Sequence, residues 1–203
     1  MLKACYLAMI FFASASLLSA ADDPEYPALL RGVKRVFFVG DSLTDGSSYP
    51  DFVINTLNGR FPEAGLQLFN AAHAGDTAIM VRKRYQADVL DLKPDLVILC
   101  IGTNDCSGKR PLADFEADYR DLIGGALKAG ARFMVVLPSP FGKDNAAREE
   151  PFQGYLAIMR QLASEFKLTV ADAHAEFLRG EAEGREMLGG DGIHHGKDGF
   201  PGM

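Results

Sequence analysis

The sequence predicts a three-layer α/β/α fold, in which helices cover both faces of a parallel sheet of about five strands. Short apolar runs recur along the chain, amphipathic helical patterns lie between them, and the two alternate about five times from residue 34 onward. Strands that are buried on both faces read as continuous apolar runs, and their alternation with helices favours a parallel sheet.

Five apolar runs are expected as strands. Several are continuous rather than alternating in polarity, as expected for strands that are covered on both faces. The runs are Val36–Val39, Leu66–Phe69, Asp95–Ile101, Arg132–Leu137 and Leu168–Ala171.

Helices are expected between these runs. Pro50 suits the first turn of a helix over about residues 50–60. Apolar residues follow helical spacing over 112–126 and again over 152–166, and Gly130 is placed to end the first of these helices.

The N-terminal residues predict export. Lys3 gives a positive start, residues 4–18 are apolar, and Ser19-Ala20-Ala21 offers small residues for cleavage. We therefore expect residues 1–21 to be a signal peptide, with a retained anchor as the alternative, and the protein to be secreted or periplasmic. Residues 22–33 then form a polar lead-in, and residues 34–203 form one domain.

Composition limits the classes of partner. Without residues 1–21, the chain has 20 basic and 27 acidic residues and a formal net charge of −7. This charge disfavours nucleic acid and stable attachment to an anionic membrane, since both require a basic surface. Cys100 and Cys106 are two thiols that do not form a disulfide framework, although a bond between them is compatible with export.

Polar clusters follow the predicted strands, at residues 40–48, 70–77, 102–108 and 138–150, and a further one spans 189–198. In open α/β sheets, ligands bind beyond the carboxyl ends of the strands, so these loops are the candidates for chemistry.

Ser42, in Gly40-Asp41-Ser42-Leu43, directly follows the first run. A serine hydroxyl becomes a useful nucleophile only with a base within hydrogen-bond reach. In the next two loops, Gly75 can bring a backbone N–H close to a substrate, and Asn104 offers a neutral amide donor. Taken singly, each of these short motifs is equally compatible with an ordinary turn.

Asp191-Gly192-Ile193-His194-His195 places an acid and an imidazole three residues apart. Such a carboxylate can fix the imidazole tautomer, so that the other ring nitrogen accepts a serine proton. His194 is the expected base and His195 the alternative. A surface loop or incidental metal binding by the two histidines also fits. His174 is expected to be structural.

Taken together and in this order, the motifs resemble those of the SGNH hydrolase superfamily, the GDSL-type esterases and lipases. The resemblance covers about residues 34–200 through Gly40-Asp41-Ser42-Leu43, Gly75, Gly102-x-Asn104-Asp105 and Asp191-x-x-His194.

This resemblance implies a flavodoxin-like fold and ester hydrolysis through an acyl-enzyme intermediate. It implies Ser42 as nucleophile, His194 as base and Asp191 as orienting acid. It also implies an oxyanion hole formed by the Ser42 N–H, the Gly75 N–H and the Asn104 side chain, with no cofactor and no metal. Relatives usually continue with a helix after Asp-x-x-His. Here Gly199-Phe200-Pro201-Gly202-Met203 opposes a helix, so the C-terminal helix is expected to be missing or truncated.

Other classes fit the motifs less well. Gly40-Asp41-x-x-Asp45-x-Gly46 resembles a dinuclear metallophosphoesterase signature, but the earlier Asp-x-His and the later Asn-His pair are absent. The α/β-hydrolase fold uses Gly-x-Ser-x-Gly, whereas Thr44 stands two residues after Ser42. An inactive carbohydrate-binding relative is the non-enzymatic alternative.

The substrate is only partly indicated. The loop after Ser42 is short and no long lid insertion is evident, which favours small or exposed esters such as acetyl groups on carbohydrate. Lysophospholipase- or thioesterase-type acyl hydrolysis is the alternative.

Overall fold

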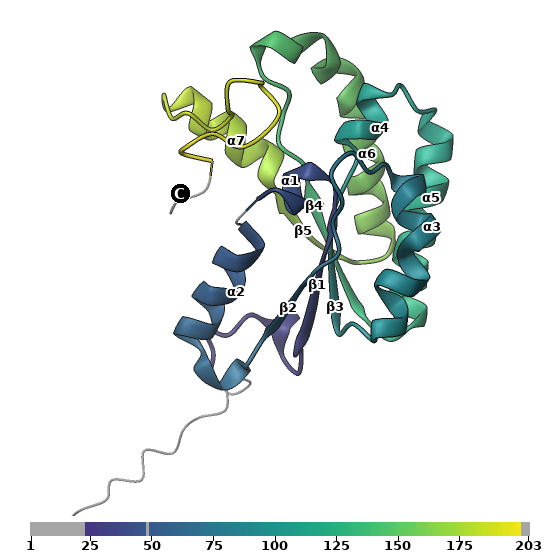
Figure 1. Ribbon diagram of the computed structural model, residues 1–203, viewed down its shortest axis with the longest axis vertical. Helices are drawn as coiled ribbons and strands as arrows, with labels where there is room; N and C mark the ends of the chain where they lie inside the picture. The colour runs from purple at the N-terminus through teal and green to yellow at the C-terminus, as the bar shows by residue number, and fades with distance from the viewer. Residues whose placement is uncertain (1–22, 48, 200–203) are drawn as a thin grey trace, which may run out of the picture.

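A computed structural model describes residues 23–47 and 49–199, so the predicted signal peptide lies outside the described residues. The core is a five-stranded sheet in the order β2-β1-β3-β4-β5, and all neighbouring strands are parallel (Figure 1). The strands are β1 (Arg35–Gly40), β2 (Gln67–Asn70), β3 (Leu96–Cys100), β4 (Arg132–Leu137) and β5 (Thr169–Asp172). Each lies on one of the five predicted runs, and the α/β fold class is confirmed.

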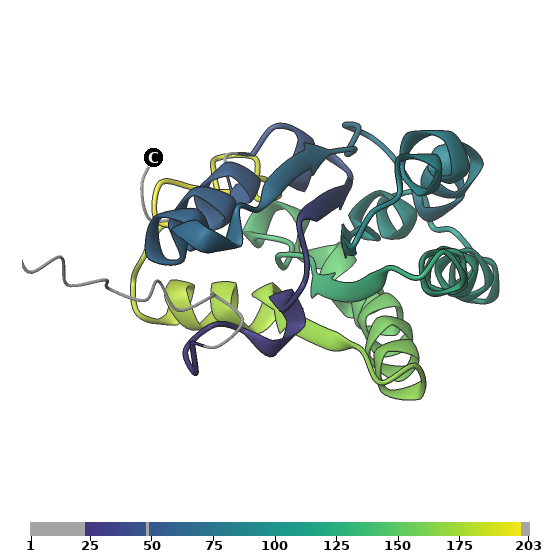
Figure 2. The same ribbon diagram turned by 90° about the horizontal axis from the view of Figure 1, so that it is seen from below.

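Helices cover both faces of the sheet (Figure 2). One face carries α3 (Ala78–Asp88), α5 (Leu112–Lys128) and α6 (Glu149–Glu165), and the other carries α2 (Tyr49–Arg60) and α7 (Ala173–Ala182). Because side chains alternate along a strand, β1 sends Phe37 and Val39 into the first layer and Val36 and Phe38 into the second. This alternation explains why the run is continuously apolar.

The predicted lead-in packs on the second layer. Tyr26, Leu30 and Val33 are buried there, and the ring of Tyr26 meets Phe61 edge-on at a centroid distance of 5.0 Å. A short 3-10 helix, η2 (Ala28–Leu30), places Leu30 in this cluster.

Two helices, α3 and α7, are not marked by a strong apolar pattern. The buried residues of α3 are Ala78, Val81 and Tyr85, separated by basic side chains that remain outside the core. The shorter elements are α1 (Ser42–Asp45), η3 (Pro62–Ala64), η4 (Leu90–Leu92), α4 (Thr103–Ser107) and η5 (Lys143–Arg148).

Cys100 and Cys106 are both buried free thiols. The first ends β3 and the second lies in α4, so neither depends on a disulfide for its place. Among the described residues, no helix is long and apolar enough to cross a membrane.

Candidate active site

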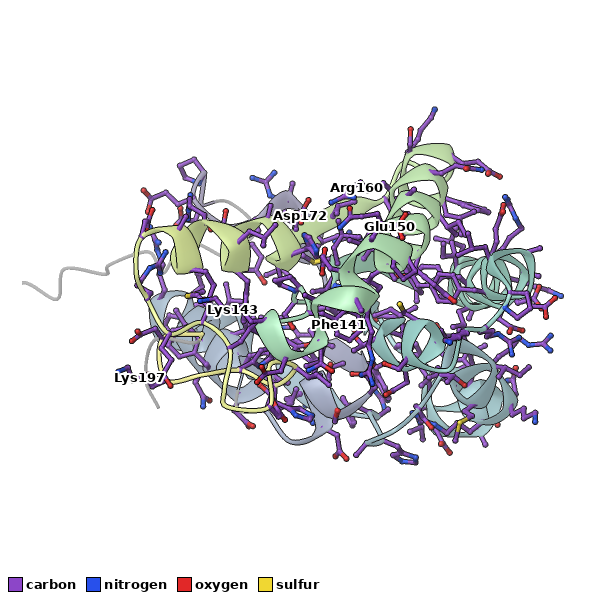
Figure 3. All side chains as sticks on the ribbon, turned by 90° about the horizontal axis from the view of Figure 1, so that it is seen from above. Phe141, Lys143, Glu150, Arg160, Asp172 and Lys197 are labelled. Carbon is purple, nitrogen blue, oxygen red and sulfur yellow. The ribbon has the colours of Figure 1, made fainter. Side chains whose placement is uncertain are left out.

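The loops that follow β1, β2 and β3 meet at the carboxyl edge of the sheet, the end seen in Figure 3. At this edge the backbones of β1 and β3 are in direct contact. A Cβ added at Gly40 would lie 2.3 Å from the carbonyl oxygen of Cys100, so this position requires glycine. The close approach seats the Ser42 loop against the centre of the sheet.

Ser42 is the first residue of α1, immediately after the end of β1. Asp41 caps this single-turn helix, since its Oδ1 accepts the Leu43 N–H at 3.0 Å. The N–H of Ser42 has no intrahelical acceptor at this position. Thr44 and Tyr49 join α1 to α2 by a hydroxyl–hydroxyl bond of 3.1 Å. The serine is therefore held by a turn that is fixed at both ends.

The structure brings Ser42, His194 and Asp191 into one line. The Oγ of Ser42 lies 2.8 Å from Nε2 of His194, and Nδ1 of the same ring lies 2.5 Å from Oδ2 of Asp191. The other carboxylate oxygen of Asp191 accepts the backbone N–H groups of Ile193 and His194, both at 3.0 Å. With Nδ1 facing a carboxylate, the imidazole presents Nε2 to the serine hydroxyl as a proton acceptor.

Hydrogen bonds keep Asp191 ionised. The bond from the His194 ring, followed by those from the backbone N–H groups of His194 and Ile193, lowers the pKa of Asp191 to about 2. Both side chains are about half exposed, at 52% for Asp191 and 49% for His194, and access to water also favours the charged carboxylate.

His195, the alternative base, faces elsewhere. Its Nδ1 lies 3.5 Å from Oγ of Ser47, and its ring packs on Phe177 at a centroid distance of 5.2 Å. Burial, with a smaller effect from the His194 charge, lowers the pKa of His195 to about 4. Geometry thus favours His194 over His195 as the partner of Ser42.

The loop after β2 is attached to the Ser42 loop. The His73 N–H donates to the Gly40 carbonyl at 3.1 Å, and the Ala74 N–H donates to Oδ2 of Asp45 at 2.9 Å. Gly75 follows with a φ of +85°, a left-handed conformation that favours glycine. Within the part of the chain that the structure describes, its N–H has no acceptor and remains available to a ligand.

Asn104 stands at the start of α4, after β3. One of its two amide hydrogens is used, because Nδ2 donates to the Asp76 carbonyl at 2.9 Å. An amide nitrogen carries two donors, so the second remains available. Gly75 and Asn104 thus belong to one hydrogen-bonded edge, with Asp76 between them.

Two buried acids near the site were given no role in the sequence analysis. Asp41 is 1% exposed, its Oδ2 has no hydrogen-bond partner among the residues that the structure describes, and burial raises its pKa to about 7. Burial also raises the pKa of Asp105 to about 6, although its carboxylate accepts the Ala78 N–H at the start of α3. In the sequence both look like ordinary turn residues, and only their position after a buried strand signals burial.

Asp41 and Asp45, the two aspartates of the metallophosphoesterase-like motif, accept hydrogen bonds from backbone N–H groups. Asp41 caps α1 and Asp45 accepts the Ala74 N–H. Among the residues that the structure describes, no group of three or more histidine, cysteine or acidic side chains could hold a metal. Both aspartates therefore act here as acceptors for backbone N–H groups.

Two cavities adjoin Ser42 or His195. A pocket of about 80 Å³ is lined by Ser42, Gly46, Ser47, His194 and His195. A larger apolar cavity of about 240 Å³ lies between the sheet and α2, and His195 contributes to its wall as well. Its other lining residues are Phe38, Leu43, Tyr49, Val53, Ile98, Cys100, Met134, Val136, Pro138, Ser139, Ala171 and Ala173.

Comparison with known proteins identifies a family and relatives of this chain. The model of the GDSL-like Lipase/Acylhydrolase family matches residues 38–200. An acetylxylan esterase from Geobacillus stearothermophilus is 26% identical over 174 residues, which cover 71% of this chain and 78% of that protein. The uncharacterized lipoprotein YqeF of Bacillus subtilis is 39% identical over 85 residues, 38% of this chain and 34% of that protein.

Solved structures share the fold. A variant of Axe2, an acetyl xylan esterase from Geobacillus stearothermophilus, has a TM-score of 0.75 at 23% identity, covering 82% of this chain and 88% of that chain. LAE5, an alpha/beta hydrolase enzyme from the metagenome of Lake Arreo, has a TM-score of 0.73 at 23% identity, covering 82% and 89%.

The chain has a parallel sheet between two layers of helices, and a serine, a histidine and an aspartate are hydrogen-bonded in line at the carboxyl edge of this sheet. Together with the family match, these features define the class of protein: the chain is a carboxylic ester hydrolase. The family model matches residues 38–200, which is most of the chain. The chain belongs to the GDSL-like lipase/acylhydrolase family, and the predicted membership of the SGNH superfamily is confirmed.

Proposed function

We propose that this hydrolase is a secreted serine esterase that removes small acyl groups, above all acetyl, from carbohydrate through an acyl-enzyme at Ser42. The observation that carries the proposal is the chain of hydrogen bonds from Ser42 to His194 at 2.8 Å and from His194 to Asp191 at 2.5 Å. A nucleophile, a base in reach of it and an acid that orients the base are the parts that acyl transfer requires.

The first half of the reaction forms the acyl-enzyme. Oγ of Ser42 attacks the ester carbonyl carbon while Nε2 of His194 takes the hydroxyl proton. Asp191 stabilises the imidazolium that results. The carbonyl oxygen becomes an oxyanion, which the N–H groups of Ser42 and Gly75 and the amide of Asn104 are proposed to bind. The C–O bond to the alcohol then breaks, and His194 returns the proton to the leaving oxygen.

The second half releases the acid. Water enters, His194 takes one of its protons, and the resulting hydroxide attacks the acyl carbon of the Ser42 ester. The same donors bind the second oxyanion. The bond to Oγ then breaks, and His194 returns the proton to Ser42, so the enzyme is restored.

The small pocket supports a short acyl group. Its volume of about 80 Å³ is one third of that of the apolar cavity of about 240 Å³. The half-exposed His194 and Asp191 leave the alcohol side open to solvent, where a sugar chain can lie. The similarity to acetylxylan esterases points to the same substrate class.

A longer acyl chain is a second candidate, because the apolar cavity of about 240 Å³ shares His195 with the small pocket. An ester panel separates the two: acetylated xylo-oligosaccharides and aryl acetate against aryl esters of longer acids and lysophospholipids. We expect turnover to fall as the acyl chain lengthens beyond a few carbons. A maximum at medium or long chains would favour the second candidate.

Ser42→Ala tests the mechanism. The variant should lose on the order of 10⁶-fold in kcat and should no longer react with a fluorophosphonate, while its thermal midpoint stays near that of the wild type. Near-normal turnover would refute the assignment. A folded wild type that neither hydrolyses any ester nor reacts with the probe would favour the inactive carbohydrate-binding alternative.

Export rests on residues 1–21 and is tested separately. Expression of the full chain in a bacterial host, followed by N-terminal sequencing of the protein outside the cytoplasm, should show a mature chain that starts near Asp22. A protein found only in the membrane fraction with Met1 intact would favour the retained anchor.

A further inference from the structure

The segment from the end of β4 to the first residue of α6, residues 138–149, lies against the loop that carries Asp191 and His194. It binds three successive backbone carbonyl groups of that loop. The amide of Asn145 donates to the Asp191 carbonyl at 2.8 Å, the Gly142 N–H donates to the Gly192 carbonyl at 2.7 Å, and Oγ of Ser139 lies 3.4 Å from the Ile193 carbonyl. In Figure 3, the part of this segment that carries Phe141 and Lys143 lies beside the C-terminal loop.

The C-terminal loop, residues 189–196, is also held by Ile193, which packs against the core, and by the ring of His195, which packs on Phe177. It belongs to no helix and no strand of the sheet, and its bridge from Leu188 to His195 is an isolated one. The side chains of Asp191 and His194 are about half exposed, so packing does not hold them. Within the loop, the Gly189 N–H donates to the His194 carbonyl at 2.8 Å, which closes the turn but does not place it relative to Ser42.

The backbones of the two segments are in direct contact. A Cβ added at Gly142 would lie 2.9 Å from Cα of Gly192, and the φ of Gly192 is +64°. Because both positions are glycines, the loops approach closely enough for the amide of Asn145 to reach the carbonyl of Asp191.

The β4–α6 segment is itself anchored by buried groups. Oε2 of Glu149 accepts the Phe141 N–H at 2.9 Å, and its Oε1 lies 2.8 Å from Nε2 of His174 on α7. His174 is 4% exposed. The ring of Phe141 meets Phe152 of α6 at a centroid distance of 5.1 Å. The segment is therefore joined to two helices, and it supports the part of the loop whose side chains, Asp191 and His194, are about half exposed.

We infer that Asn145 is a positioning residue, which holds the Asp191 backbone so that the carboxylate and the His194 ring stay in line with Ser42. The inference rests on the proposed function. Asn145 is the one side chain of residues 138–149 that donates to the main chain of Asp191. Its loss leaves that carbonyl unbound, and a shift of about 1 Å in a reacting group can lower turnover ~10²-fold.

Asn145→Ala and the isosteric Asn145→Asp test the inference, since neither retains the amide donors. Asp144→Asn is the matched control, because Asp144 is the exposed neighbour on the same short helix. We expect both Asn145 variants to lose about 10- to 100-fold in kcat on aryl acetate with little change in KM, and to react with a fluorophosphonate more slowly by a similar factor. Asp144→Asn should stay within about twofold of the wild type.

A spectroscopic measurement tests the same inference without reference to any substrate. The short bond between His194 and Asp191 should give a far-downfield proton resonance, identified by its absence in His194→Ala. In Asn145→Ala this resonance should broaden or shift upfield, whereas in Asp144→Asn it should not change. Thermal midpoints close to that of the wild type would show that the variants are folded.

Two failures are then distinguishable. A folded wild type that reacts with neither ester nor fluorophosphonate contradicts the proposed function, while the proton resonance still reports on Asn145. A wild-type rate of fluorophosphonate reaction together with an unchanged resonance in both Asn145 variants overturns the inference and leaves the proposed function intact.

Discussion

The two halves of the site are built in different ways. The Ser42 half lies at the junction of a central strand and a capped turn, where Asp41 is 1% exposed and Gly40 touches the neighbouring strand. The His194 half lies on an irregular loop whose reacting side chains are about half exposed. The core fixes the first half by packing, whereas the second half combines the packing of Ile193 and His195 with hydrogen bonds from residues 138–149. Apart from Ser42 itself, substitutions in the first half should therefore mainly affect stability, and substitutions of Asp191 and His194 should mainly affect turnover.

The largest effect is expected from His194→Ala compared with His195→Ala. Removing His194 should lower kcat by about 10⁵- to 10⁶-fold without loss of stability, because its ring is exposed and serves as the base. Removing His195 should lower the thermal midpoint, since its ring packs on Phe177, and should lower kcat less than about tenfold. Kinetics on aryl acetate and calorimetry measure both effects. The reverse order of the two kcat values would make His195 the base.

Asp191→Asn should come next. Loss of the charge that orients the imidazole should lower kcat about 10⁴-fold, while the amide retains the geometry of the turn. Asp198→Asn, an acid of the same C-terminal region outside the line to Ser42, is the control. Equal losses in the two variants would contradict a specific role for Asp191.

Asp41 should make stability depend on pH. Its pKa rises on folding from the ordinary value of 3.8 to about 7, so the folded state prefers the protonated acid. The stabilisation relative to the ionised form is full below about pH 4 and is lost as pH rises through about 7, a change on the order of a few kcal/mol. Asp41→Asn should lose less stability over this range than the wild type does, as measured by urea unfolding from pH 4 to 8.

The exposed Asp51 on α2 provides the control for this measurement. Asp51→Asn should unfold with the same pH dependence as the wild type. If Asp41→Asn also follows the wild-type curve, the buried acid carries no pH-dependent stability.

A pair of glycine substitutions gives the smallest effect and the most direct comparison of the two halves. Gly40→Ala would place Cβ at 2.3 Å from a backbone oxygen and should cost about 1–3 kcal/mol or more of unfolding free energy. Gly190→Ala adds a methyl group where no heavy atom lies within 4 Å, and should change stability by less than about 0.5 kcal/mol. Similar costs at both sites would contradict the contrast.

The sequence predicted the parts of the fold that local pattern determines. The five strands are short apolar runs, and α5 and α6 repeat apolar residues at helical spacing. Helix α3 was not found because its buried face holds only Ala78, Val81 and Tyr85 among basic residues.

Contacts between residues far apart in the chain could not be predicted from the sequence. Asn145 looks like a solvated loop residue, and its partner stands 46 residues away. The pair of Glu149 and His174 is separated by 25 residues, so nothing local shows that a buried histidine meets an acid. Sequence spacing alone also could not decide whether His194 or His195 is the base. In the folded chain, the ring of His194 contacts Ser42, whereas the ring of His195 contacts Ser47.

The bond between Ser42 and His194 joins residues 152 positions apart. No nascent chain shorter than 194 residues can contain the assembled site, and closing a loop of this length costs chain entropy. The polypeptide thus cannot assemble this site until the loop that carries Asp191 and His194 docks against Ser42. In a refolding experiment, the recovery of ester hydrolysis should lag behind the recovery of the helical circular-dichroism signal. Activity would then report on the docking of the loop that carries Asp191 and His194.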